Sequence, residues 1–310
     1  MLRLTDLTGR VIDKVKMSIE RLKAFEPPEG YYLAFSGGKD SVVLKALADM
    51  AGVKYDAHYN VTTVEPPELV RFIKNQHKDV VFESPEKTMR QLIIAKKMPP
   101  TRIQRYCCEH LKETNGKGRV TLTGVRWAES KGRRDNQGMV TILSGKRNKE
   151  TLAIAEEQGA NFQKIMRGGV ILNLDNAAER RTVELCYRTK QTLVNPIIDW
   201  TDDDVWEFIK GEGIPYCHLY DEGCKRLGCV GCPLGGASSM IWETEVKWPQ
   251  FRGFYVKTFD EMIAARLKDG KKHKTPAWMN GENLFMWWTG RFQNPVEGQI
   301  SLFEAENMEN

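Results

Sequence analysis

The chain has 310 residues, of which 41% are hydrophobic and 28% are charged, a composition that is ordinary for a soluble globular protein. No apolar run approaches the roughly 20 residues that are needed to cross a bilayer, and the first residues lack the apolar core of a signal peptide. We therefore expect a cytoplasmic protein that does not enter a membrane. The net charge of +5 allows a polyanionic partner without requiring one.

The seven cysteines argue against a secreted disulfide framework, because their number is odd and five of them fall into two tight groups. The grouped cysteines are Cys107, Cys108, Cys224, Cys229 and Cys232. Cys186 and Cys217 stand apart, and we expect each of them to be a small buried hydrophobic residue. The grouping favours metal or redox chemistry in a reducing compartment.

Strand and helix patterns alternate through the first 125 residues. The expected elements are a helix over 10–26, a strand over 31–35, a helix over 40–51, a strand over 55–61, a helix from 66–67, a strand over 80–82, a helix over 85–96 and a strand over 120–125. This alternation predicts an α/β fold with a doubly wound parallel sheet and helices on both faces. Ligands of such sheets bind at the carboxyl ends of the strands.

The middle of the chain is less regular. Residues 131–170 are polar and interrupted by glycines, and we interpret them as an insertion over the site with one helix near 149–158. Regular structure is expected again at 194–200. A helix should follow it with Thr201 as its N-cap, because acidic residues fill the favoured first turn.

The last part of the chain is expected to form a small helical extension over residues 249–310. A helical pattern covers 253–268, and an aromatic run follows at 284–288. That run is more typical of a core than of a surface for stacking bases. We therefore predict a nucleotide-binding domain over 1–248 and a second domain after it.

Residues 36–41 read Ser36-Gly37-Gly38-Lys39-Asp40-Ser41. Two glycines permit a sharp turn and a close approach to a ligand. The serines and the first N–H groups of the next helix present donors where the helix dipole is positive, and Lys39 adds a charge. An ordinary glycine-rich turn is the alternative, but such a turn rarely combines both serines with Lys39 and Asp40. The segment predicts a site for an anion such as phosphate, with a spacing unlike the Walker pattern.

The triplet Cys224-x4-Cys229-x2-Cys232 predicts a metal centre, because thiolates at these spacings can converge on one site. The spacing does not fix the type of centre: a four-cysteine zinc site and merely buried thiols are the alternatives. A fourth thiolate must come from elsewhere in the chain. The pair Cys107-Cys108 is the best source, since its cationic surroundings would stabilise a thiolate; the sequence does not say which of the two it is.

Two further strings complete a family resemblance. They are GVRWAES over 124–130 with Arg133-Arg134, and the segments 196–206, 213–216 and 219–223. With the 36–41 loop and the cysteines, they resemble the phosphoadenosine phosphosulfate (PAPS) reductase family of adenine-nucleotide α-hydrolases. The loop itself resembles the pyrophosphate-binding loop of the ATP pyrophosphatases, which cut ATP between the α and β phosphates. The resemblance covers roughly residues 30–235, with five motifs in the family's order.

The resemblance implies an ATP-pyrophosphatase-like fold in which Arg126, Glu129 and the 36–41 loop surround the phosphates of a nucleotide. It also implies that the cysteines hold a [4Fe–4S] cluster, since the pair Cys107-Cys108 looks like the tandem ligands of cluster-bearing adenylyl-sulfate reductases.

In a site of this kind the nucleotide is ATP, accompanied by Mg²⁺. Lys39 would offset charge on the leaving pyrophosphate, and Asp40 would orient the metal or cap the helix. Arg126 and Arg133 would clamp phosphates. We therefore expect Lys39, Asp40 and Arg126 to act in catalysis.

Two departures separate the chain from the reductases of that family. Those reductases typically carry a degraded phosphate loop, whereas this loop is intact, and they use a late catalytic cysteine, whereas no cysteine follows Cys232 here. The pattern instead resembles relatives that activate a substrate with ATP and insert sulfur, such as DNA phosphorothioation proteins and tRNA thiolases. We expect an enzyme that cleaves ATP, adenylates a substrate and supports sulfur transfer in nucleic-acid modification.

The expected partners are ATP or another adenine nucleotide, DNA or tRNA, and a sulfur-donor protein such as a cysteine desulfurase. An assimilatory PAPS or APS reductase is the alternative function, and a nucleotide-sensing subunit is a second alternative. The sequence leaves open the substrate, the sulfur donor and the oligomeric state.

Overall fold

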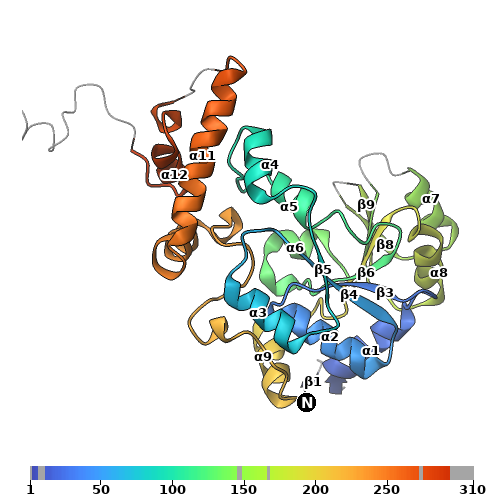
Figure 1. The fold of residues 1–310 in the computed structure, drawn as a ribbon. Coiled ribbons are helices and arrows are strands. Elements are labelled where there is room, and N and C mark those ends of the chain that lie inside the picture. Colours follow the sequence, from blue (N-terminus) through green and yellow to red (C-terminus); the bar gives the residue numbers. More distant parts are fainter. Residues whose placement is uncertain (1, 6–10, 145–148, 166–167, 272–274, 294–310) are drawn as a thin grey trace, which may run out of the picture. The chain divides into compact units, whose positions relative to one another are not determined.

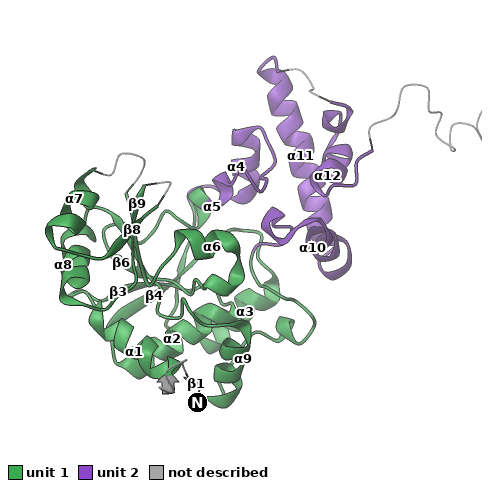
Figure 2. Cartoon of the chain, turned by 180° about the vertical axis from the view of Figure 1, so that it is seen from behind, with its two compact units in different colours: residues 1–85, 109–228 green, residues 86–108, 229–310 purple. Residues whose placement is uncertain are grey.

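The structure is a computed structural model that describes residues 2–5, 11–144, 149–165, 168–271 and 275–293 (Figure 1). Within these ranges, no helix combines the length and the apolar character that a membrane span requires. Contacts group the chain into two units, residues 1–85 with 109–228 and residues 86–108 with 229–310 (Figure 2). The boundaries of these units differ from the domain boundary expected after residue 248. The division into domains at that residue stays a prediction.

The first unit is built on a sheet of eight described strands. In sheet order they are β5 (Val81–Glu83), β4 (Tyr55–Asn60), β3 (Tyr31–Ala34), β6 (Val120–Leu122), β10 (Gln191–Val194), β7 (Val140–Leu143), β9 (Gly169–Leu172) and β8 (Phe162–Lys164). Neighbours from β5 to β10 pair in parallel, and the pairs beyond β10 are antiparallel. The sheet is therefore mostly parallel, and the predicted α/β class is confirmed.

Helices flank this sheet. The described helices of the first unit are α1 (Lys14–Ala24), α2 (Lys39–Ala51), α3 (Pro67–Gln76), α6 (Lys131–Asn136), α7 (Lys149–Glu157), α8 (Ala177–Cys186) and α9 (Asp202–Gly211). Helix α2 packs against α1 and α9, while α7 packs against α8 and β9. A small antiparallel pair, β1 (Arg3–Thr5) and β2 (Val11–Asp13), precedes α1.

Strand β3 lies inside the parallel part of the sheet. Its residues Tyr31 and Leu33 are fully buried, as are Val43 and Leu44 in the helix that follows. A strand covered on both faces has a continuous apolar sequence rather than an alternating one, which explains the run over 31–35. The turn from β3 to α2 therefore connects a buried strand, at its carboxyl end, to a helix with a buried first half.

Residues 131–170, which are predicted to be an insertion, contain strands that the sequence does not predict. These residues contribute β7 and β8 and the beginning of β9, so that they extend the sheet, and β7 pairs with β10 from Val140–Val194 to Leu143–Gln191. Each of these strands has only three or four residues, which is too short for an alternating pattern to identify it in the sequence. The helix expected near 149–158 is present as α7.

The second unit is helical. Its described helices are α4 (Met89–Lys96), α10 (Ala237–Ile241), a π-helix (Trp242–Lys247), α11 (Gln250–Lys268) and α12 (Gly281–Trp288), and α5 (Tyr106–Leu111) begins in it. Helix α11 packs against α4 and α12. Leu284 and Phe285 are fully buried, and Trp288 packs on Tyr255 with ring centroids 4.7 Å apart. The interpretation of the aromatic run as core is confirmed for these residues.

Candidate active site

The turn between β3 and α2 has a conformation that requires glycine. Gly37 has a φ of +72°, and a Cβ atom there would lie 2.7 Å from Cδ1 of Ile73. The two serines hold the turn from within: Ser41 donates from Oγ to the carbonyl of Gly38 at 2.9 Å, and the Oγ atoms of Ser36 and Ser41 lie 3.1 Å apart. The turn is thus preformed.

The N-terminus of α2 meets an aromatic hydroxyl. The backbone N–H of Lys39 donates to the hydroxyl oxygen of Tyr220 at 2.9 Å. Burial raises the pKa of this tyrosine, and its ring packs edge-on against Trp206. Tyr220 belongs to the string that carried the family resemblance, but sequence reasoning gave it no individual role.

Arg126 is the centre of an ionic network, although it is only 2% exposed. Its Nε donates to Oδ1 of Asp40 at 2.7 Å, and its Nη2 donates to Oδ1 of Asp202 at 2.6 Å. Its Nη1 donates to the carbonyl of Trp200 at 3.2 Å. Burial alone would lower the pKa of Arg126, but the two carboxylates raise it overall.

Lys39 belongs to the same network. Its Nζ lies 3.5 Å from Oδ2 of Asp40 and 3.3 Å from Oδ1 of Asp202. Burial acts to raise the pKa of Asp202, but Arg126 and Lys39 outweigh it, so that this pKa is lowered. Two cations and two carboxylates therefore meet directly beside the glycine turn. Sequence reasoning missed Asp202, because an acidic residue in the first turn of a helix needs no further explanation.

Glu129 and Arg133 complete the group of predicted nucleotide ligands. Arg133 Nε lies 3.2 Å from Oε2 of Glu129. Burial and the charge of Asp40 raise the pKa of Glu129. The charges of Arg133, Arg126 and Lys39 lower it, but the net shift is upward. The structure thus brings all of these predicted residues into one neighbourhood at the carboxyl end of the parallel strands.

Four of the five grouped cysteines lie in the second unit. They are Cys107, Cys108, Cys229 and Cys232, and all four are half-buried. A hydrogen bond with Cys108 raises the pKa of the Cys107 thiol, burial adds to this, and the charges of Cys108, Cys229 and Cys232 raise it further. Burial raises the pKa of the Tyr255 phenol, and the charges of Cys229, Cys232 and Cys107 raise it further. Cys107 is therefore near the other three cysteines.

Cys224 is in a different setting. It is buried in the first unit. Its charge, like that of Cys217, raises the pKa of the Tyr220 phenol. In the described part of the chain, no three His, Cys, Asp or Glu side chains converge as a single metal ion would require. Cys186 and Cys217 are fully buried, as expected.

Residues 30–234 match the family model of the phosphoadenosine phosphosulfate reductase domain. The chain belongs to this family. The family resemblance of the sequence is therefore confirmed.

The alignments with curated relatives of this PAPS reductase family member cover only part of each relative. An adenosine 5'-phosphosulfate reductase of Oceanobacillus iheyensis is 49% identical over 45 residues, 14% of this chain and 19% of that protein. A probable FAD synthase of Caenorhabditis briggsae is 25% identical over 269 residues, 87% of this chain and 38% of that protein. An uncharacterized 37.8 kDa protein of Escherichia phage 186 is 38% identical over 85 residues, 27% of this chain and 25% of that protein.

Two solved structures are similar to the PAPS reductase family member described here. A PAPS reductase of Candida auris aligns with a TM-score of 0.41 and 11% identity, over 70% of this chain and 88% of that one. An FMN adenylyltransferase of Candida glabrata in complex with ATP aligns with a TM-score of 0.37 and 15% identity, over 70% of this chain and 60% of that one.

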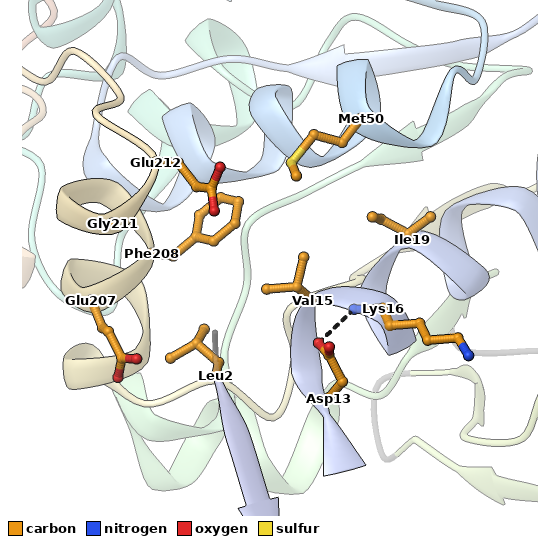
Figure 3. A pocket seen from close by; sticks show the side chains of 10 residues that line it. All are labelled: Leu2, Asp13, Val15, Lys16, Ile19, Met50, Glu207, Phe208, Gly211 and Glu212. Atoms are coloured by element: carbon orange, nitrogen blue, oxygen red, sulfur yellow. Dashed lines mark hydrogen bonds between the residues drawn. The ribbon is translucent and has the colours of Figure 1, made fainter. Parts of the chain in front are cut away.

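A pocket of about 230 Å³ lies elsewhere in the first unit (Figure 3). Val15 and Ile19 of α1, Met50 of α2 and Phe208 of α9 give it an apolar lining. None of the predicted site residues lines this pocket. The ionic network beside the glycine turn is therefore the candidate active site of this PAPS reductase family member.

Proposed function

We propose that the chain is an ATP-pyrophosphatase-type enzyme that adenylates a substrate and supports sulfur transfer in nucleic-acid modification. The observation that carries the proposal is the pair of cations, Lys39 and Arg126, that converge beside a preformed glycine turn. A triphosphate has more charge to offset than a single phosphate, so an intact loop with two cations suits ATP.

The two cations are held by different contacts, and this difference suggests separate roles. Arg126 is buried and fixed by three hydrogen bonds, so it would hold the α-phosphate in place. The Nζ atom of Lys39 pairs with Asp40 and with the exposed carboxylate of Asp202. A bound nucleotide would draw the ammonium toward the leaving pyrophosphate.

Asp40 and Asp202 offer the carboxylate oxygens that Mg²⁺ takes as ligands, so the donor set fits this ion. When bound, the ion supplies positive charge at the phosphates. The protein's own contribution is to keep both carboxylates fixed against Arg126.

The proposed reaction has two steps. An oxygen of the substrate attacks the α-phosphorus, the bond from that phosphorus to the bridging oxygen breaks, and pyrophosphate leaves with the electron pair. Sulfide from a donor protein, such as a cysteine desulfurase, then displaces AMP from the adenylated substrate. Lys39 and Arg126 would stabilise the charge that develops on the phosphate oxygens.

Cys107, Cys108, Cys229 and Cys232 are the proposed ligands of a [4Fe–4S] cluster. Four neighbouring thiolates are the ligand set of such a cluster, which spreads its ligands farther apart than a single ion does. The cluster would supply iron and sulfide chemistry at this place. Zinc is the alternative metal.

A sulfonucleotide reductase is the second candidate function, and the family match favours it. Anaerobically purified protein should be given ATP with duplex DNA or tRNA and sulfide, and AMP and pyrophosphate should be measured. A parallel reaction with PAPS and thioredoxin should be assayed for sulfite. AMP with pyrophosphate, and no sulfite, supports the proposal; sulfite without pyrophosphate overturns it in favour of the reductase.

A further inference from the structure

The loop between α4 and α5 carries an aliphatic side chain that projects into solvent. Ile103 is 91% exposed, more than any other exposed large hydrophobic residue in the described ranges, of which the next is Val246 at 67%. Its neighbours Arg102, Gln104 and Arg105 are also exposed. A single exposed apolar residue is common, so the loop must be judged by its rigidity and its charge.

Hydrogen bonds fix the loop on both sides of Ile103. The N–H of Thr101 donates to the carbonyl of Gln104 at 3.1 Å, and the N–H of Gln104 donates to Oγ1 of Thr101 at 2.9 Å. The buried indole of Trp288 donates to the carbonyl of Pro100 at 2.6 Å. Ile103 is therefore presented by a preorganised loop, which lowers the entropic cost of inserting it into a partner.

The segment around the loop is strongly basic. Residues 87–108 contain six lysines and arginines and no aspartate or glutamate. Arg90 pairs with Glu261 and Lys97 pairs with Asp269, whereas Lys96 lies over the ring of Tyr106. Arg102 directly precedes Ile103 and is exposed, so the tip of the loop carries a positive charge that fits a polyanion.

We propose that Ile103 is a wedge that inserts between stacked base pairs of duplex DNA, while Arg102 contacts a phosphate beside it. This rests on the proposed function in nucleic-acid modification and names the form of its substrate. Aliphatic wedges unstack duplex steps, whereas single strands are usually bound by aromatic rings, which the loop tip does not offer. One isoleucine buries too little apolar surface to hold a membrane.

The test uses the full-length protein, without ATP, and a duplex with 2-aminopurine, whose fluorescence rises when the base unstacks. The wild type should bind the duplex and raise this fluorescence. Ile103→Ala should remove the rise and weaken binding about tenfold. Arg102→Ala should keep the rise but make the negative slope of log affinity against log salt shallower by about 0.9. Val246→Ala and Lys268→Ala, which change exposed residues of the same unit, should behave as the wild type.

Three outcomes would overturn the proposal: no binding to the duplex, an undiminished rise with Ile103→Ala, or an effect of Ile103→Ala that appears only with anionic vesicles or single-stranded RNA. Because the assay contains no ATP, its result is independent of the adenylation step. If Ile103 raises the 2-aminopurine fluorescence but the protein never releases pyrophosphate, the proposed function is refuted and the proposed DNA contact is still supported.

Discussion

Arg126 donates from Nε to Oδ1 of Asp40 at 2.7 Å and so joins the phosphate loop to a residue 86 positions away in the chain. The guanidinium is buried, so removing Asp40 would leave a buried charge with one fewer partner. The pairing makes the loop and the segment after β6 one structural unit.

Lys39→Ala should reduce pyrophosphate release about 10²–10³-fold, because the ammonium would stabilise charge that develops only during phosphate cleavage. Circular dichroism and thermal unfolding should show that the fold is retained. Lys54→Ala is the control, since Lys54 is exposed directly before β4, at the amino end of the strands. An unchanged rate in Lys39→Ala would mean that the loop does not act on a triphosphate.

Asp202→Asn should lower the free energy of unfolding at neutral pH by less than about 1 kcal/mol, because the lost ion pairs are partly exposed. The folded-state pKa of Asp202 is depressed, so its contribution is present above the unfolded-state pKa of about 4 and is lost as the pH falls further. Urea unfolding of both proteins between pH 7 and pH 2 measures this. Asp203→Asn, an exposed neighbour in the same turn, is the control; a difference that persisted at the lowest pH would contradict the ionic explanation.

Gly37→Ala should destabilise the protein by about 2 kcal/mol, because a side chain would be forced into a left-handed conformation and against Ile73. Equilibrium unfolding in urea gives the number. Gly211→Ala should leave stability unchanged or slightly higher, since no heavy atom lies within 4 Å of a Cβ at that position. Equal stabilities for the two variants would show that the turn is not held as rigidly as its hydrogen bonds indicate.

Protein purified without oxygen should be brown, with broad absorbance at about 400 nm from a cluster bound by four thiolates. Cys107→Ser, Cys108→Ser, Cys229→Ser and Cys232→Ser should each lose iron and absorbance, whereas Cys224→Ser should keep both. Cys186→Ser is the control for a buried cysteine away from the group. Stoichiometric zinc without iron would refute the cluster, and loss of iron in Cys224→Ser alone would refute this ligand set.

Local features were predictable from the sequence because neighbouring residues determine them. The turn at 36–41 needs glycine for its backbone, and α2 follows from the apolar spacing after it. The pairing of Arg126 with Asp202 was not predictable, since the two lie 76 residues apart and only the folded sheet brings them together. Asp202 also has an ordinary local role in the first turn of α9, which conceals its part in the network.

The cysteines show a similar limit of sequence spacing. The spacing of Cys224, Cys229 and Cys232 suggested that the three act together, yet Cys224 lies in the first unit and the other two lie in the second. Cys107 and Cys108 precede Cys229 and Cys232 by more than 100 residues in the chain, and Cys107 is near these two only in the folded protein. The ligand set itself stays a prediction until the metal is measured.

The second unit is made of two stretches of chain, and residues 109–228 are synthesised between them. Its first stretch, 86–108, therefore leaves the ribosome long before the helices that it packs against, and it must wait while the sheet of the first unit is completed. Cys107 and Cys108 cannot meet Cys229 and Cys232 until that interval has passed. Assembly of a metal centre at these cysteines would thus be one of the last events in the maturation of the protein.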